Sequence, residues 1–143
     1  MLPILKEHLE LGNQTVLISG FRNLTQAFWH EPGQRLDRLQ SDFPNLEVIY
    51  SSDDGSFGLH GLVTQQLETM LKQANTLGLG IGEVIAIGPP LMMRAVSEST
   101  RPYGVKTIAS LNSVMIDATG MSGACMVPVH KEDQLLRKQA CVD

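Results

Sequence analysis

Short apolar runs rich in β-branched residues alternate along this chain with stretches of helical spacing, and this alternation constrains the fold most strongly. The apolar runs, each bounded by turn residues, lie at 15–20, 46–50, 83–88 and 105–110. Helical patterns fill the intervals at 2–11, 25–30, 34–40, 61–74 and 90–99. Two further short strands are expected at 126–129 and 139–142, on either side of a polar turn. Because strands that alternate with helices are typical of βαβ units, we predict an α/β fold with a parallel sheet of about four strands.

The composition limits the class of protein. Of the 143 residues, 43% are hydrophobic and 18% are charged, which is expected for one globular domain. The net charge of −4 offers no basic surface for nucleic acid. No run approaches the roughly 18 consecutive apolar residues of a membrane span, and the first residues lack the apolar core of a signal peptide. We therefore expect a cytoplasmic protein that binds neither nucleic acid nor membrane.

Near the C-terminus, residues that can bind a metal follow a recognisable spacing. Intervals of four, two and fifteen residues separate them, and the first two intervals match the C-x4-C-x2-C spacing of plant-type [2Fe–2S] sites. Gly120 and Gly123 would let the loop wrap closely around a cluster, because glycine permits positive φ. The spacing predicts a [2Fe–2S]-type site with candidate ligands Asp117, Ser122, Cys125 and Cys141.

The two cysteines allow other chemistry. Because His130 lies close to Cys125 in sequence, a zinc site that combines both cysteines with His130 and Asp117 is an alternative. A catalytic thiol is not expected, since the sequence around Cys125 shows no accompanying His–Asx pair. Two functions therefore stay open: a redox domain with an altered cluster site, and a nucleotide-binding module that has lost its cluster.

Three loops that follow predicted strands carry suitable groups for a ligand, since open α/β sheets bind ligands beyond the carboxyl ends of their strands. Arg22 could pair with a phosphate through two hydrogen bonds. Asp53 and Asp54 could hydrogen-bond ribose or nicotinamide amide groups. The segment 88–90 joins a strand to a helix, whose first amides would face a phosphate. Taken singly, each also fits a plain role: an exposed arginine, an acidic turn and a strand-to-helix corner.

Several short motifs occur in a characteristic order. They are IGPPLMM at 87–93, YGVKT at 103–107, SLN at 110–112, DATGM at 117–121 and ACVD at 140–143. Together they resemble the dihydroorotate dehydrogenase electron-transfer subunit family. The nearer branch is formed by the small subunits of sulfide dehydrogenase and NADH-dependent ferredoxin:NADP oxidoreductase. The resemblance covers nearly the whole chain.

This resemblance implies a ferredoxin-reductase-like, Rossmann-like fold. Residues 1–112 would form an NAD(P)-binding domain, and residues 113–143 a small loop and β tail that binds a [2Fe–2S] cluster. Asp117, Cys125 and Cys141 match the family's cluster ligands, whereas Ser122 stands where the family has Cys. A serine oxygen is a harder and poorer partner for iron than a thiolate. The residues that would border the nicotinamide nucleotide are Gly20, Arg22, Asp53, Asp54, Gly55, Gly88, Pro89 and Met92.

The resemblance also implies parts that this sequence does not contain. The family's first βα unit, with its glycine-rich pyrophosphate loop, would precede the helix at 2–11, and an FAD-binding barrel would precede that unit. We therefore expect a fragment or a truncated paralogue, with FAD supplied by a missing domain or a partner. The central strand of a 3-2-1-4-5 sheet would be absent, so a second copy of the chain could cover the exposed sheet edge.

By resemblance, the chain is an electron-transfer component that passes electrons between NAD(P)H, flavin and iron–sulfur centres. Its partner would be an oxidoreductase subunit or an FAD-domain protein, and we expect the isolated chain to be inactive alone. The alternative is a truncated, cluster-less nucleotide-binding or protein-interaction domain without redox activity.

Overall fold

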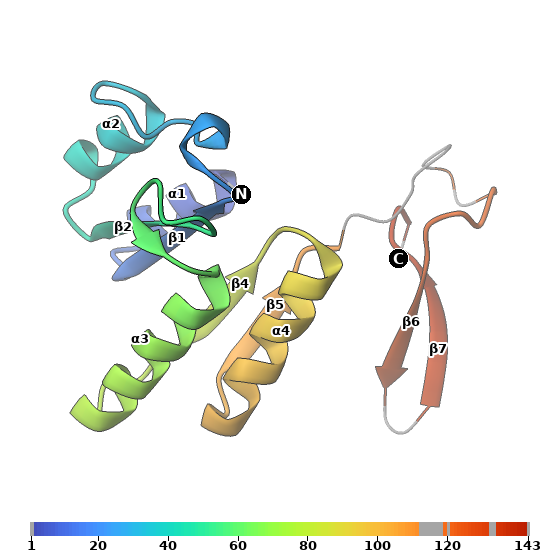
Figure 1. Ribbon diagram of the computed structural model, residues 1–143. Helices are drawn as coiled ribbons and strands as arrows, with labels where there is room; N and C mark the ends of the chain where they lie inside the picture. Colours follow the sequence, from blue (N-terminus) through green and yellow to red (C-terminus); the bar gives the residue numbers. More distant parts are fainter. Residues whose placement is uncertain (1, 112–118, 120, 132–133, 143) are drawn as a thin grey trace.

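The computed structural model describes residues 2–111, 119, 121–131 and 134–142 (Figure 1). Its α-helices are α1 (Leu2–Glu10), α2 (Arg35–Asp42), α3 (Val63–Leu77) and α4 (Pro90–Thr100), and short 3-10 helices lie at Leu24–Gln26 and Arg101–Tyr103. Its strands are β1 (Thr15–Phe21), β2 (Leu46–Ser52), β3 (Leu59–His60), β4 (Glu83–Ala86), β5 (Lys106–Ala109), β6 (Met126–Lys131) and β7 (Gln134–Gln139). They form the sheets β1-β2-β3, β4-β5 and β6-β7.

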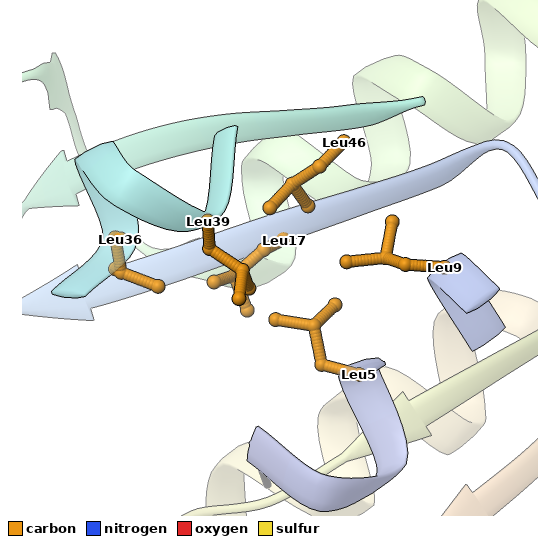
Figure 2. Packing of buried hydrophobic residues seen from close by; sticks show 6 residues of the cluster. All are labelled: Leu5, Leu9, Leu17, Leu36, Leu39 and Leu46. Carbon is orange, nitrogen blue, oxygen red and sulfur yellow. The ribbon is translucent and has the colours of Figure 1, made fainter. Parts of the chain in front are cut away.

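A cluster of buried leucines holds the amino-terminal part together (Figure 2). Strands β1 and β2 pair in parallel from Thr15↔Leu46 to Phe21↔Ser52. Helices α1 and α2 cover one face of this pair, where their leucines meet Leu17 of β1. Each buried leucine contributes about 1.5–3 kcal/mol relative to an exposed one, so the cluster fixes both helices on this face. Its members are Leu5, Leu9, Leu17, Leu36, Leu39 and Leu46.

A second cluster lies on the opposite face of β1. Ile18 packs against it, and in a strand its side chain points away from the side on which Leu17 lies. Thr100 at the end of α4 is buried, and its hydroxyl lies 2.6 Å from the hydroxyl of Thr107 in β5, which ties α4 to that strand. The buried members, from α3, β4 and α4, are Leu67, Leu71, Ala86, Met93 and Val96.

The strands of the two larger sheets are parallel, as the sequence predicts. They lie in two sheets rather than one, because β1 pairs with β2 and β4 pairs with β5, and no described strand joins β1 to β4. Both strands nevertheless contact the second cluster, through Ile18 of β1 and Val84 of β4. The parallel array is therefore interrupted between β1 and β4.

The helix predicted at 25–30 is wrong, since only the 3-10 turn Leu24–Gln26 forms there. A helix of six residues has little stability of its own, because its nucleation is costly. Aromatic contacts hold the segment otherwise: Phe28 packs edge-on against Phe21 and Trp29, and the hydroxyl of Tyr50 donates to the carbonyl of Trp29 at 3.4 Å. Trp29 accordingly adopts a φ of 60°, which a helix cannot contain.

The C-terminal hairpin differs in part from the expected strands at 126–129 and 139–142. Strands β6 and β7 pair antiparallel from Met126↔Gln139 to Lys131↔Gln134, so the second strand ends at Gln139. Beyond it, the amide of Val142 donates to the carbonyl of Gln139 at 3.0 Å and closes a turn. The register of the hairpin, rather than the apolar pattern of 139–142, therefore sets where the strand ends.

The domain boundary predicted at residue 112 lies outside the described residues. Among the helices of the described ranges, none has the length and apolar character needed to cross a membrane.

Candidate functional site

The carboxyl ends of β1 and β2 bring two predicted loops together. Phe21 is the register partner of Ser52, so the residues that follow each strand emerge side by side. The amide of Asp53 donates to the carbonyl of Phe21 at 3.0 Å, and the amide of Asp54 donates to the carbonyl of Arg22 at 3.3 Å. The side chains of Arg22, Asp53 and Asp54 are on exposed residues. One cation and two carboxylates therefore flank this edge of the sheet.

Two buried serines hold the acidic loop against the end of β2. Ser51 and Ser52 are 0% exposed. The Ser52 hydroxyl donates to the carbonyl of Phe57 at 2.7 Å and accepts the amide of Phe57 at 2.9 Å. The Ser51 hydroxyl donates to the carbonyl of Gly61. These bonds satisfy buried polar groups and fold the loop back on its own strand.

Asp54 organises the tip of the same loop. Its Oδ1 accepts the Ser56 hydroxyl at 2.6 Å and the Ser56 amide at 2.9 Å. These two hydrogen bonds, the hydroxyl first, lower the pKa of Asp54 below its usual value, because they favour the ionised carboxylate. The Ser56 hydroxyl also accepts the amide of Leu24 at 2.8 Å, which links the two loops. One oxygen of the Asp54 carboxylate thus stabilises the loop and is less available to a ligand.

Gly20 lets helix α3 approach the carboxyl end of β1. A Cβ atom at this position would collide with Cγ1 of Val63, the first residue of α3. Packing alone therefore explains a glycine at this position, because only glycine leaves room for α3, whether or not Gly20 borders a nucleotide. The two readings are compatible, since close backbone approach also suits a ligand.

The other predicted loop lies at the carboxyl end of β4. Pro89 is the N-cap of α4, and its carbonyl accepts a hydrogen bond from the amide of Met93 at 3.0 Å. Pro89 and Pro90 carry no amide hydrogen, so Leu91 and Met92 supply the amides that remain at the start of the helix. Met92 is half-buried against the second cluster, and its Cε lies where a Cβ on residue 88 would collide with it. Met92 therefore packs partly in the core, with its methyl group beside Gly88, which stays exposed.

The C-terminal hairpin brings the two cysteines together. Cys125 directly precedes β6, and Cys141 follows β7 after Ala140. Their Sγ atoms lie 2.8 Å apart as thiols, and the amide of Ala140 donates to the carbonyl of Cys125 at 3.1 Å. Cys125 is 2% exposed. Two cysteines with fifteen residues between them thus meet at the open end of one hairpin.

The remaining predicted ligands are placed less completely. Asp117 lies outside the described residues. Ser122 is exposed, and its hydroxyl accepts the amide of Ala124 at 3.4 Å. His130 lies five residues along β6 from Cys125, about 17 Å at the usual rise of a strand, so the hairpin does not favour the zinc alternative. Within the described ranges, no group of three or more His, Cys, Asp or Glu residues is arranged to hold a metal.

Sequence reasoning missed several residues that shape these loops. Ser51 and Ser52 read as ordinary loop residues, although they are the buried anchors of the acidic turn. Gly58 has a φ of 66°, and a Cβ there would collide with the backbone carbonyl of Tyr50. Val63 reads as an ordinary helix residue, although it contacts the carboxyl end of β1. The only available signal was the glycine-rich punctuation of 55–61.

Comparison with known proteins finds relatives along almost the whole chain. A Thermotoga maritima protein named dihydroorotate dehydrogenase B (NAD(+)), electron transfer subunit homolog is 31% identical over 142 residues, which is 99% of this chain and 44% of that protein. An uncharacterized protein in the adh 3′ region of Clostridium beijerinckii is 36% identical over 141 residues, which is 99% of this chain and 43% of that protein. The chain therefore spans less than half the length of these relatives.

A solved structure is similar to the same extent. It is that of an NADH-dependent reduced ferredoxin-NADP oxidoreductase, described for flavin-based electron bifurcation. The match has a TM-score of 0.68 and 30% sequence identity, and it covers 99% of this chain and 45% of that chain. This similarity confirms the predicted α/β fold of the ferredoxin-reductase type. No known family model matches the chain.

Proposed function

We propose, from its confirmed resemblance to the dihydroorotate dehydrogenase B electron transfer subunits, that this chain is the NAD(P)-binding part of an electron-transfer oxidoreductase. It passes electrons between NAD(P)H, a flavin and iron–sulfur centres. The observation that carries this proposal is the extent of the match. Because 99% of the chain aligns, the likeness includes both the parallel sheets and the hairpin that carries the two cysteines.

The nicotinamide nucleotide binds at the carboxyl ends of β1, β2 and β4. The guanidinium of Arg22 donates paired hydrogen bonds to a phosphate, which is the strongest contact that this edge offers. The carboxylate of Asp53 accepts a hydrogen bond from a ribose hydroxyl. Asp54 stands beside it but is held by Ser56, so Asp53 is the more available acceptor. The exposure of Arg22 and Asp53 supports this assignment.

Helix α4 supplies the second set of contacts. The amides of Leu91 and Met92 point from the positive end of the helix dipole, where a phosphate or carboxamide oxygen is stabilised. Gly88 and Pro89 are exposed and leave the approach to these amides open. Gly20 and Gly55 provide backbone without side chains at the facing edge.

The donor chemistry of the hairpin fits an iron–sulfur cluster in part. Cys125 and Cys141 would supply two adjacent thiolates, the ligands that such clusters use most. Asp117 and Ser122 would supply oxygen ligands, which bind iron more weakly than thiolate. When bound, the cluster would carry single electrons while a flavin exchanges hydride with the nicotinamide. The hairpin's own contribution is to hold the thiols together and shield Cys125 from water.

The proposed electron transfer also requires a flavin and a final electron acceptor. We place FAD on another domain or a partner oxidoreductase subunit. Residues 1–112 then serve as the nucleotide-binding unit, and residues 113–143 as the electron-transfer tail. The names of the relatives support a partner subunit, since they describe electron transfer subunits.

Titration calorimetry with NADH and NADPH tests the nucleotide site. The Arg22→Ala variant should bind about ten-fold more weakly or worse, because a charge-assisted hydrogen bond contributes about 1.5–3 kcal/mol. Arg38→Ala is the matched control, since Arg38 is also an exposed arginine but lies on α2 rather than after β1. Equal affinity of the two variants would contradict the assignment.

Anaerobic reconstitution with iron and sulfide tests the cluster site. Iron content and the visible absorbance spectrum should show partial loading of the natural chain and greater loading of Ser122→Cys. Cys125→Ser should abolish loading. Colourless, iron-free protein for both the natural chain and Ser122→Cys would reject the redox function.

One observation favours the alternative function. Ser122 stands where the family that the chain resembles has a cysteine. A chain that binds no cluster at this position would act as a nucleotide-binding or protein-interaction domain. In that case NADH binding survives while reconstitution fails for the natural chain, and restoring the thiol at residue 122 does not restore iron.

A further inference from the structure

The open end of the C-terminal hairpin holds both cysteines of the chain. The carbonyl of Cys125 accepts the amide of Ala140 at 3.1 Å, and Cys141 lies in the turn that the amide of Val142 closes on the carbonyl of Gln139. The two Sγ atoms lie 2.8 Å apart as thiols. Because the sequence contains two cysteines, each is the only thiol that the other can meet within one chain.

This geometry suits a disulfide. Two cysteines can be bridged without backbone movement only where their Cβ atoms converge. The contact between the Sγ atoms of Cys125 and Cys141 shows that the side chains already converge. The backbone hydrogen bond from Ala140 to Cys125 holds the two segments in place beside each other. A bond between the sulfurs therefore requires a movement of the side chains and leaves the register of the hairpin unchanged.

The two thiols differ in their access to solvent. Cys125 is 2% exposed, whereas Cys141 is half-buried. Thiol–disulfide exchange requires access to the attacking sulfur. Cys141 is therefore the residue that meets a reagent from solvent, and Cys125 lies beside it as the resolving thiol.

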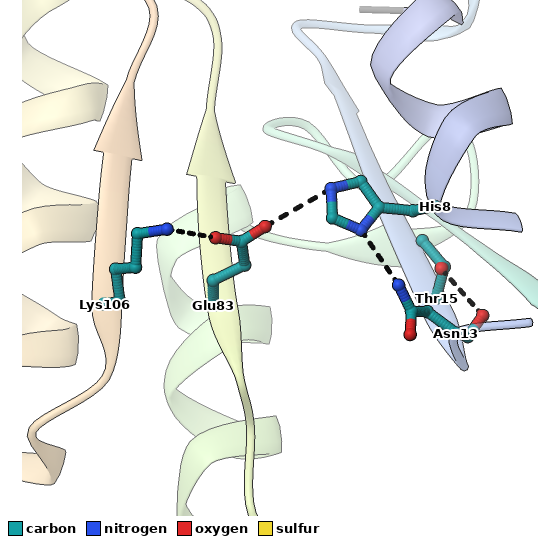
Figure 3. A network of polar contacts seen from close by, with 5 residues as sticks. All are labelled: His8, Asn13, Thr15, Glu83 and Lys106. Atoms are coloured by element: carbon teal, nitrogen blue, oxygen red, sulfur yellow. Dashed lines mark hydrogen bonds and ion pairs between the residues drawn. The ribbon is translucent and has the colours of Figure 1, made fainter. Parts of the chain in front are cut away.

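Packing supports the hairpin weakly. The side chains of β6 and β7 are exposed or half-buried along both strands, and Figure 1 shows the hairpin apart from the helices. The α/β part has contacts between distant segments: Glu83 of β4 pairs with Lys106 of β5 at 2.9 Å and lies 3.3 Å from His8 of α1 (Figure 3). An isolated two-stranded hairpin is marginally stable in water. A covalent link at its open end would therefore stabilise it strongly.

We propose that Cys125 and Cys141 form a reversible disulfide that cross-links the open end of the hairpin, with a low-molecular-weight disulfide such as oxidised glutathione as the oxidant. The Sγ of Cys141 attacks one sulfur of the oxidant, whose S–S bond breaks, and one glutathione leaves with the proton of Cys141. The Sγ of Cys125 then attacks the Sγ of Cys141, and the second glutathione leaves with the proton of Cys125. The protein thiols are oxidised to a disulfide, and the oxidant is reduced to two thiols.

The disulfide does not depend on the proposed cluster. It uses the two thiols alone, and across the described ranges these thiols belong to no group of three or more His, Cys, Asp or Glu residues that could hold a metal. The two states exclude each other, because a metal binds the thiolate form of cysteine. The cross-linked chain therefore has to be reduced before Cys125 or Cys141 can bind iron.

A redox titration of the iron-free chain tests the proposal. The reduced chain is equilibrated without oxygen in buffers of reduced and oxidised glutathione, and its intact mass and thiol content are measured. Both thiols should disappear together, with a mass loss that corresponds to the two thiol hydrogens, and peptide mapping should link Cys125 to Cys141. A stable glutathione adduct on either cysteine, or a disulfide between two chains, would overturn the proposal.

Single substitutions test the order of the two steps. Cys125→Ser leaves the half-buried Cys141, which should accumulate a glutathione adduct because the resolving thiol is gone. Cys141→Ser leaves the buried Cys125, which should react with oxidised glutathione at least about ten-fold more slowly, because access controls the rate. Equal rates for the two variants would contradict Cys141 as the attacking thiol.

Hydrogen–deuterium exchange measures the effect on the hairpin. The register places ladder amides at Val127, Val129 and Leu136. In the oxidised chain these amides should exchange at least about ten-fold more slowly than in the reduced chain, because the link closes a loop of fifteen residues and restricts its opening. The amide of Leu17 in β1 is the internal control and should not change. A disulfide that leaves exchange in β6 and β7 unchanged would overturn the proposed stabilisation.

Discussion

Gly58 offers a test of how the acidic loop is held at the carboxyl end of β2. Its φ of 66° lies in the left-handed region, and a Cβ atom would collide with the carbonyl of Tyr50, a backbone atom that cannot rotate away. Gly58→Ala therefore combines two costs. Gly12 shares the first cost alone, because its φ is 80° but nothing lies within 4 Å of an added Cβ.

The magnitudes follow from this difference. An L-residue in the left-handed region costs about 1–2 kcal/mol, of which about 0.4–1 kcal/mol is offset because alanine reduces the freedom of the unfolded chain. This net cost of about 0–1.6 kcal/mol is expected for Gly12→Ala. Gly58→Ala adds about 1–3 kcal/mol for the forced backbone shift. The two midpoints of thermal unfolding should then differ by about 2–12 °C.

Thermal and urea unfolding, followed by circular dichroism and the fluorescence of Trp29, measure both variants against the natural chain. Two-dimensional NMR locates the shift, which should centre on 51–61 for Gly58→Ala and on the α1–β1 turn for Gly12→Ala. If the two variants lose the same stability, the loop does not press on Tyr50 and the described packing of the acidic loop is wrong.

Other measurements test neighbouring contacts. Ser56→Ala should raise the pKa of Asp54 toward its usual value in an NMR titration. That pKa is lowered in the folded chain. The stability that these loop contacts contribute is therefore fully present above the pKa of the unfolded chain, and it is lost as the pH falls through the pKa of the folded chain. Lys106→Ala should raise the pKa of Glu83, which the Lys106 hydrogen bond lowers most strongly; an unchanged pKa would count against the ion pair at 2.9 Å. Leu71→Ala, at a site 2% exposed, should cost about 2–5 kcal/mol in urea unfolding, and less than about 1 kcal/mol would contradict its central packing.

Local patterns predicted most of the elements of this fold but not their final pairing. The apolar run at 15–20 and the helix at 90–99 follow from side-chain spacing, which acts within a few residues. The segment around Trp29 escaped the same reasoning, because its conformation depends on rings from Phe21 and on the hydroxyl of Tyr50. The division of the parallel strands into two sheets depends on pairing across the whole chain, which periodicity does not report.

The sequence predicted the candidate sites to different degrees. Arg22 and Asp53 could be placed together in advance, since the carboxyl ends of parallel strands share one edge. The contact between Cys125 and Cys141 follows from the register of β6 and β7, which the sequence predicted only approximately. Ser52 could not be singled out, because a buried hydroxyl that bonds a loop carbonyl looks in sequence like any turn serine.

The division of the parallel strands into two sheets bears directly on nucleotide binding. Arg22 and Asp53 follow the first parallel sheet, whereas Gly88 and the start of α4 follow the second. A ligand that contacts both sets must also fix the two sheets relative to each other, and the free energy of that ordering subtracts from its affinity. A ligand that contacts one set alone avoids this cost but makes fewer hydrogen bonds.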